Sequence, residues 1–318
     1  MAYTAGDPIL DDEYNTFVNS SSDPFGYNHF AGPGALQYGL NQSTISTVSA
    51  GDTINAAHWN SLFTGMDNIA NHTNDTMTSR SSVSAGDAIA IKAAVVADLA
   101  TLAASVAAGS PNATALDTTA VGTSTNSGTF NGTSTIERSV TFANNNTMRA
   151  FFNGGGKIRI DPTCVTGIDG DKDTVFNDLT TTATGNLDIK AHASTRSGSG
   201  ETLTTNGLAN GFHDLGTGYT VILKLTSDNS GYTSNTVEYS AKLNAAVASA
   251  TVLTVKMVSV DADGDDTFTS PNTSGVPSNP NEAPRMTLAL IEEFPTNAQG
   301  LAANIQSASN AEVSNSTS

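Results

Sequence analysis

Hydrophobic and polar positions change their spacing about one third of the way along the chain. Before Pro111, apolar residues fall on one helix face, as Ile9, Tyr14, Phe17 and Val18 do, which predicts amphipathic helices. After Pro111, apolar and polar residues alternate in short runs, which predicts strands. We expect eight of these strands, over 136–143, 147–152, 157–161, 186–192, 219–226, 236–243, 251–260 and 286–292.

Turns rich in Gly, Asn, Asp and Pro separate these runs, so the second half predicts an antiparallel β-sandwich. The expected fold class is therefore α+β. A helical and extended assembly region over 1–112 precedes a jelly-roll or immunoglobulin-like sandwich over 113–294. The small, polar segment 295–318 predicts a flexible C-terminal tail, or an arm on a partner.

A repeat marks the helical region. The tripeptide AGD occurs three times, at 5–7, 50–52 and 85–87. Aligning the first two copies matches Tyr14 with Trp59 and Asn15 with Asn60. Each AGD is expected to begin a helix, with its Asp accepting hydrogen bonds from N–H groups of the first turn. Two interpretations stay open: a repeated helix that docks on a partner, and a recurrent capping motif.

An alanine-rich stretch, 88–108, follows the third AGD. Lys92 and Asp98 within it argue against membrane insertion. Its larger apolar residues are spaced by four, three and four positions, which predicts packing within a bundle or against symmetry-related copies. Those residues are Val95, Leu99, Leu102 and Val106.

The strand expected over 147–152 would place Phe151 and Phe152 on opposite faces. Both cannot then face the core of a two-layer sandwich, so one is expected to contact another domain or subunit. Gly154, Gly155 and Gly156 would form the turn of that hairpin. The full predicted assembly interface is Ile9, Tyr14, Phe17, Ile54, Trp59, Leu62, Phe63, Val95, Leu99, Leu102, Val106, Phe151 and Phe152.

Composition narrows the function classes. Charged residues are only 14%, and 13 Lys+Arg stand against 30 Asp+Glu, for a net charge of −17. A nucleic-acid partner needs a basic surface, which this balance excludes. The single cysteine, Cys164, excludes a disulfide framework and a thiolate zinc site. The N-terminus has neither the basic nor the apolar region of a secretory signal peptide, so classical secretion is not expected.

Two acidic turns are the candidate metal sites. IDGDKD (168–173) places Asp169, Asp171 and Asp173 at alternate positions, as in the first half of a calcium loop. Thr174 and Thr180 stand where an EF-hand has its Gly and its final acidic residue. DADGDD (261–266) offers Asp261, Asp263 and Asp265 at a strand end. Calcium is the cofactor that these turns would hold, and a solvated acidic turn is the alternative.

No catalytic residue is predicted, and the chain is not expected to be an enzyme. The run NGGGKI (153–158) lacks the spacing of a phosphate-binding loop, and neither a G-x-S-x-G nor an H-E-x-x-H motif occurs. The histidines are scattered and are expected at surfaces or interfaces rather than as ligands; they are His29, His58, His72, His192 and His213.

Three runs resemble a family of tailed-phage virion structural or tail-fibre-like proteins: VTFANNNTMRAFFNGGGKIRI (140–160), GFHDLGTGYTVILKL (211–225) and TVEYSAKLNAAVASATVLTVKMVSVDADGDD (236–266). The shared patterns are an FFN-x-GG-x-IR hairpin, a strand ending in an acidic turn, and N-terminal AGDxIxxxxxN segments. The resemblance implies a structural protein, assembled in the host cytoplasm and located in the virion. It implies no catalytic residue.

The expected function is a subunit of a symmetric tail-associated assembly (fibre, collar or baseplate) or a head decoration. Its partners would be further copies of itself and other virion proteins, without nucleic acid or membrane insertion. One alternative is a receptor- or glycan-binding module of the tail that uses loop 261–284, Tyr232 and Tyr239. The other is a polysaccharide hydrolase, which needs a carboxylate pair that the sequence does not single out.

Overall fold

The structure is a computed structural model of residues 1–318, and it describes residues 11–85, 87, 92–109, 116–167, 170–262, 283–295, 301 and 309–318. The chain divides into two compact units. The helical unit comprises Met1–Asp117, Asn144–Gly156 and Phe294–Gln306. The sandwich unit comprises Thr118–Ala143, Lys157–Glu293 and Ser307–Ser318. The helical unit therefore draws one short segment, Asn144–Gly156, from the region that we expected to be a sandwich, and another, Phe294–Gln306, mainly from the predicted tail.

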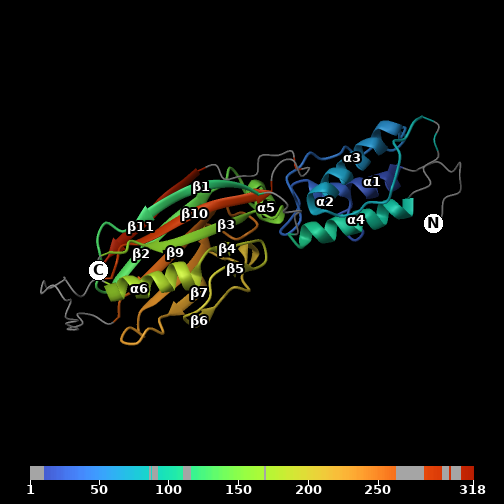
Figure 1. Ribbon diagram of the computed structural model, residues 1–318. Coiled ribbons are helices and arrows are strands. Elements are labelled where there is room, and N and C mark those ends of the chain that lie inside the picture. The colour runs from blue at the N-terminus through green and yellow to red at the C-terminus, as the bar shows by residue number, and fades with distance from the viewer. Residues whose placement is uncertain are drawn as a thin grey trace, which may run out of the picture. The chain divides into compact units, whose positions relative to one another are not determined.

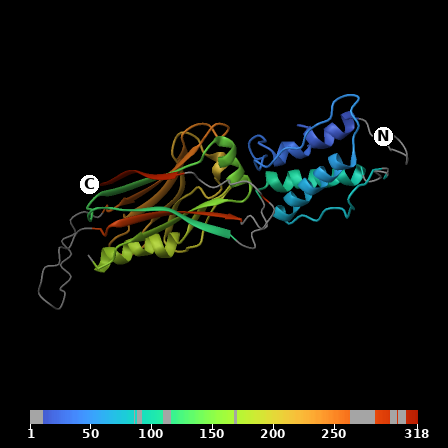
Figure 2. The same ribbon diagram turned by 90° about the horizontal axis from the view of Figure 1, so that it is seen from above.

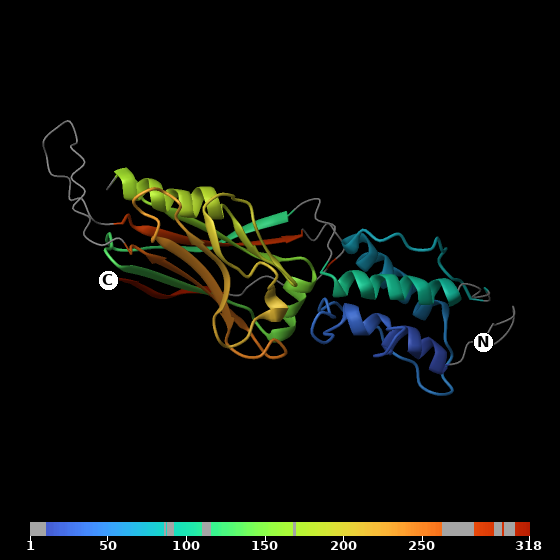
Figure 3. The same cartoon turned by 90° about the horizontal axis from the view of Figure 1, so that it is seen from below.

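The described part of the helical unit contains the helices α1 (Asp11–Asn19), α2 (Tyr27–Ala31), α3 (Ala56–Thr73), α4 (Lys92–Ala107) and α5 (Asn145–Asn153). Helices α3 and α4 pack on each other, and α1 and α2 pack on α4 (Figures 1 and 3). The predicted 4-3-4 stripe of α4 is buried in this core. Bundle packing of the alanine-rich helix is confirmed for its described part.

Helix α5 replaces the strand that we predicted over 147–152, and that prediction was wrong. Asn144 begins the helix by accepting a hydrogen bond from Thr147 N at 2.9 Å, and Gly154 ends it. Phe151 and Phe152 are both fully buried inside the helical unit, where their rings meet edge to face at 5.1 Å. The Asn144 cap stabilises the start of this helix. Because the segment is helical, its neighbouring side chains do not point to opposite faces as they would in a strand.

Two antiparallel sheets form the sandwich unit (Figure 1). The five-stranded sheet has the order β1-β10-β3-β4-β5, and the six-stranded sheet has the order β11-β2-β9-β8-β7-β6. The α+β class with a β-sandwich is thus confirmed. The strands are β1 (Leu116–Thr125), β2 (Thr133–Thr141), β3 (Lys157–Cys164), β4 (Leu187–Ile189), β5 (Ser194–Arg196), β6 (Thr202–Asn206), β7 (Thr220–Thr226), β8 (Thr236–Leu243), β9 (Val252–Val260), β10 (Met286–Pro295) and β11 (Ser309–Thr317).

Alternating side chains of these strands make the core between the sheets. On β9, for example, Leu253, Val255 and Met257 are buried while Lys256 is half-exposed. Helix α6 (Gly170–Asn177), the π-helical turn η1 (Asp178–Thr184) and the short 3₁₀ helix η2 (Phe212–Asp214) complete the unit. Because η1 contacts β3 of one sheet and β7 and β8 of the other, it joins the two layers, and α6 lies along the same side (Figure 2).

Strand β11 falls within the segment that we expected to be a flexible tail. It pairs antiparallel with β2 over eight residue pairs, from Ser309↔Thr141 to Thr317↔Ser134. Apart from Ala311 and Val313 its sequence is polar, and a strand at the sheet edge can be held by main-chain hydrogen bonds without the apolar alternation that reveals an inner strand. The same reasoning explains why β1, β5 and β6 were not predicted.

Candidate functional site

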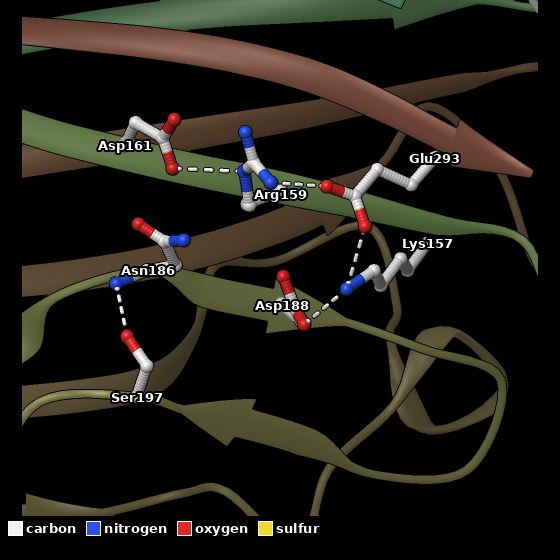
Figure 4. Close-up of polar contacts among 7 residues, drawn as sticks. All are labelled: Lys157, Arg159, Asp161, Asn186, Asp188, Ser197 and Glu293. Carbon is white, nitrogen blue, oxygen red and sulfur yellow. Dashed lines mark hydrogen bonds and ion pairs between the residues drawn. The ribbon is translucent and has the colours of Figure 1, made fainter. Parts of the chain in front are cut away.

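A charged cluster on one face of the five-stranded sheet is the densest group of ionisable side chains that the described residues bring together (Figure 4). Lys157, on β3, contacts Asp188 of β4 and Glu293 of β10, each at 2.7 Å from its Nζ. Arg159, two residues further along β3, contacts the other carboxylate oxygen of Glu293. Its Nε lies 3.0 Å from Asp161 Oδ1.

Strand geometry explains why these residues meet. Lys157, Arg159 and Asp161 occupy alternate positions of β3 and so share one face, while Ile158 and Ile160 point into the core. The register places Glu293 directly opposite Lys157 on one side and Asp188 opposite Arg159 on the other. Three strands are thereby tied together by their own side chains.

Electrostatics hold Lys157 in its charged form. Burial alone would lower the pKa of the ammonium, but hydrogen bonds and the negative charges of Asp188 and Glu293 outweigh burial and raise the pKa. An ammonium held in this way is a poor base or nucleophile at neutral pH. Glu293, whose side chain is only 7% exposed, has both oxygens engaged by cations. The cluster fixes strands rather than presenting a reactive group.

The acidic residues predicted to bind calcium are only partly described. Asp169, Asp263 and Asp265 lie outside the described residues. Asp171 is exposed in the first turn of α6, and buried Asp173 accepts a hydrogen bond from Gly167 N. Among the described residues, no group of three His, Cys, Asp or Glu side chains could hold a metal ion.

Asp261 has a partner that the sequence did not reveal. Its carboxylate lies 2.7 Å from Lys172 Nζ, and both side chains are 0% exposed. Asp261 is at the end of β9 and Lys172 is on α6, so this ion pair anchors the helix to the sandwich. A cation at Asp261 would have to compete with the ammonium of Lys172.

Nearly all of the predicted assembly residues form the internal core of the helical unit. Ile9 lies outside the described residues, and Ile54 is half-buried. Trp59 packs on Tyr14, Phe17 and Phe63 at ring distances between 5.7 and 5.8 Å. The described side chains with little or no exposure are Tyr14, Phe17, Trp59, Leu62, Phe63, Val95, Leu99, Leu102, Val106, Phe151 and Phe152. These apolar side chains stabilise the chain itself and do not present a surface to a partner.

The repeat has an internal use that our reading of it missed. Asn15 donates to Val48 O at 2.8 Å and accepts from Val48 N at 2.9 Å. The aligned Asn60 makes the same two bonds to Val83, at 2.9 and 2.8 Å. Each clamped valine lies two residues before the next AGD. The asparagine of one repeat therefore fixes the main chain just before the next AGD. The alignment of Asn15 with Asn60 was the feature of the sequence that could have revealed this contact.

Asp52 does not cap a helix, which corrects our expectation for the second AGD; Asp7 and residues 88–91, which follow Asp87, lie outside the described residues. Asp52 accepts from Ser49 N at 3.0 Å, and Asp87 accepts from Ser84 N at 2.8 Å, so each Asp closes a turn just after the clamped valine. Asn55 caps α3 instead, accepting from the N–H groups of Ala57 and His58. The Asp side chain reaches back to an upstream amide because the chain turns before the helix begins.

Two further expectations change with burial. Tyr239, proposed as a glycan contact, is 0% exposed in the sandwich core, whereas Tyr232 is half-buried. His72, expected at a surface or interface, is 1% exposed and contacts Gly154 O at 2.9 Å through Nε2. Most of the proposed glycan loop 261–284 lies outside the described residues.

Two shallow hollows on the helical unit carry little chemistry. One, of about 410 Å³, has Asp12 as its single carboxylate. The other, of about 580 Å³, lies beside α3 and the extended segment near Ile45, and is lined mainly by Asn, Ser and Thr side chains. Neither hollow brings two carboxylates together.

Comparison with known proteins found no match to this chain among protein-family models, curated proteins or solved structures. No helix within the described ranges is both long and apolar enough to span a membrane.

Proposed function

We propose that this chain is a non-catalytic structural subunit of a symmetric assembly. The observation that carries the proposal is the cluster of Figure 4, in which Lys157 and Arg159 engage both oxygens of Glu293. Charged groups of this kind are available for chemistry in an enzyme, but here they are used to join neighbouring strands.

The same use of charge recurs elsewhere in both units. Lys172 pairs with Asp261 in the sandwich unit, and Arg80 pairs with Asp98 at 3.0 Å in the helical unit. Arg80 also lies 4.9 Å from the centre of the Phe63 ring. Removing one partner of such a buried pair is costly because it leaves an uncompensated charge, so each pair ties together the two segments that carry it. Rigid, internally paired units suit a protein whose role is to keep a shape.

The resemblance of 140–160, 211–225 and 236–266 to tailed-phage virion proteins supplies the biological setting of this proposal. Within a virion the chain would serve in a tail fibre, collar or baseplate, or as a head decoration. Its net charge of −17 keeps an exposed particle surface soluble.

Light scattering and sedimentation of the purified chain test the proposal. We expect a discrete multiple of the 32.5 kDa chain mass at micromolar concentration. A chain that remains monomeric up to about 100 μM would refute it, because this concentration is well above the dissociation constant of a stable subunit interface. Immunogold labelling of intact phage particles then tests the setting, because a virion protein is expected to be labelled at one repeated position.

A further inference from the structure

Strand β11 differs from every inner strand of its sheet because none of its side chains is buried. The neighbouring strand β2 buries Ile136 and Val140, and β9 beyond it buries three apolar side chains. Val313, the largest apolar residue of β11, is 53% exposed at a bulge between Glu312 and Ser314. The hydrophobic effect therefore contributes little to holding β11 in place.

The side of β11 that follows the inner face of β2 is polar. Opposite Ile136, Arg138 and Val140 stand Asn315, Glu312 and Asn310, in that order. No apolar side chain of β11 enters the core, so this strand can leave without pulling an anchor out of it. The main-chain ladder to β2 and a few polar contacts are what hold it.

Those polar contacts are nevertheless specific. Arg138 donates to Asn310 Oδ1 at 2.9 Å and to Ser124 Oγ at 2.6 Å. Asn315 accepts from Asn126 Nδ2 at 2.7 Å and donates to Thr125 O at 3.0 Å. The Asn310 bond fixes β11 against Arg138 of β2, and the Asn315 bonds fix it against the end of β1.

Arg138 of β2 needs hydrogen-bond acceptors from the strand that pairs with this edge. Its side chain is buried, at 6% exposure for the residue, and within the described ranges no carboxylate lies at ion-pair distance from it. A buried guanidinium needs oxygen acceptors. Asn310 of β11 supplies one of them, so the open edge of β2 would favour this particular strand over an unrelated one.

We propose that β11 is an exchangeable strand, which pairs with β2 of a second copy of this chain and so links copies within the assembly. The exchanged strand would make the contacts that it makes here, so strand exchange adds no strain at the pairing itself. The proposal rests on the structural function above, which supplies the assembly, but the experiment below detects strand exchange independently of that function.

Cysteine cross-linking between two differently tagged copies tests the exchange. Ser139 and Ala311 face each other across β2 and β11, and the native cysteine is removed by Cys164→Ala. One copy carries Ser139→Cys and the other Ala311→Cys, and the two are refolded together and oxidised. We expect a covalent dimer joining the two tags. The matched control mixes Ser139→Cys with Thr254→Cys, which face each other across β2 and the inner strand β9.

A mixed dimer at least about tenfold more abundant than in the control supports exchange. A yield no higher than the control overturns it, and so does a chain carrying both cysteines that closes only on itself at every concentration. If the chain oligomerises without the mixed cross-link, strand exchange fails while the structural function stands. A chain that is monomeric throughout contradicts the structural function as well.

A labelled peptide of residues 309–318, incubated with the full chain, gives a second measurement that needs no cysteine. We expect the peptide to bind the full chain, and its binding is measured by the increase in its fluorescence polarisation. The peptide with Asn310→Ala and Asn315→Ala is expected to bind about tenfold more weakly, because it lacks the side chains that bond to Arg138 and to the end of β1. Equal binding of the two peptides would contradict the specific acceptor edge.

Discussion

We expect His72 to make the helical unit less stable in mild acid. Burial lowers the pKa of His72 from its ordinary 6.5 to about 4, although the hydrogen bond to Gly154 O acts in the opposite direction. In the unfolded chain the imidazole would regain a pKa near 6.5. As the pH falls below 6.5, the unfolded state therefore binds a proton before the folded state does.

This difference fixes both the pH window and the magnitude. Stability from a neutral His72 is complete above pH 6.5 and is lost progressively as the pH falls towards 4. A pKa that falls from 6.5 to about 4, at about 1.4 kcal/mol for each pH unit, corresponds to roughly 3 kcal/mol of unfolding free energy. That is a large share of the stability of an ordinary domain.

The assay compares the wild-type chain with His72→Gln, whose side-chain amide can still donate to Gly154 O but cannot titrate. Trp59, the single tryptophan, is buried in the same unit and reports its unfolding by fluorescence in urea. Between pH 6.5 and 4 the wild type should lose about 3 kcal/mol relative to the variant, because all other titrating groups are common to both. His192→Gln, at an exposed site, is the matched control.

A stability difference between wild type and His72→Gln that stays constant within about 0.5 kcal/mol across this window would refute the reasoning. It would mean that the His72 imidazole is protonated as easily in the folded chain as in the unfolded one.

Three other changes have defined outcomes. Lys172→Met should cost about 3–5 kcal/mol in thermal unfolding followed by circular dichroism, because it leaves the buried Asp261 carboxylate without its ammonium, and adding Asp261→Leu should restore most of the loss. Asn60→Ala should cost about 1–3 kcal/mol and speed hydrogen exchange at the Val83 amide, whereas Asn68→Ala, at an exposed position of the same helix, should do neither. Gly156→Ala should lower the melting temperature, because its Cβ would lie 2.5 Å from Phe151 O; an unchanged melting temperature would contradict the tight packing of that turn.

Seven of the eight predicted strands are present, because alternating burial leaves a period-two pattern that can be read locally. The exception, 147–152, is instructive. Its residues include Phe151 and Phe152 side by side, which fits a strand only if one of them is exposed. The helix buries both, and the deciding feature was the cap at Asn144, which lies just outside the segment.

The candidate site was less predictable than the fold. Lys157, Arg159 and Asp161 could be placed on one face of a strand from spacing alone. That Glu293 would lie opposite Lys157 depended on pairing two segments more than a hundred residues apart. The same applies to Asp261, which sequence reasoning assigned to calcium and the structure pairs with Lys172.

The sequence by itself determined the inner strands and the helices α1, α3 and α4, because these depend on residue spacing over a few positions, but it did not reveal α2, α5 or α6. It also determined the repeat, including the aligned Asn15 and Asn60. Only the tertiary structure decided what the polar residues do. The side chains of Asn15 and Asn60 bond the main chain of Val48 and Val83, and β11 covers the edge of β2. His72 is buried, which lowers its pKa and favours the neutral imidazole. A polar side chain has no preferred partner along the sequence, so its role is set by whichever distant group the fold brings within hydrogen-bond distance.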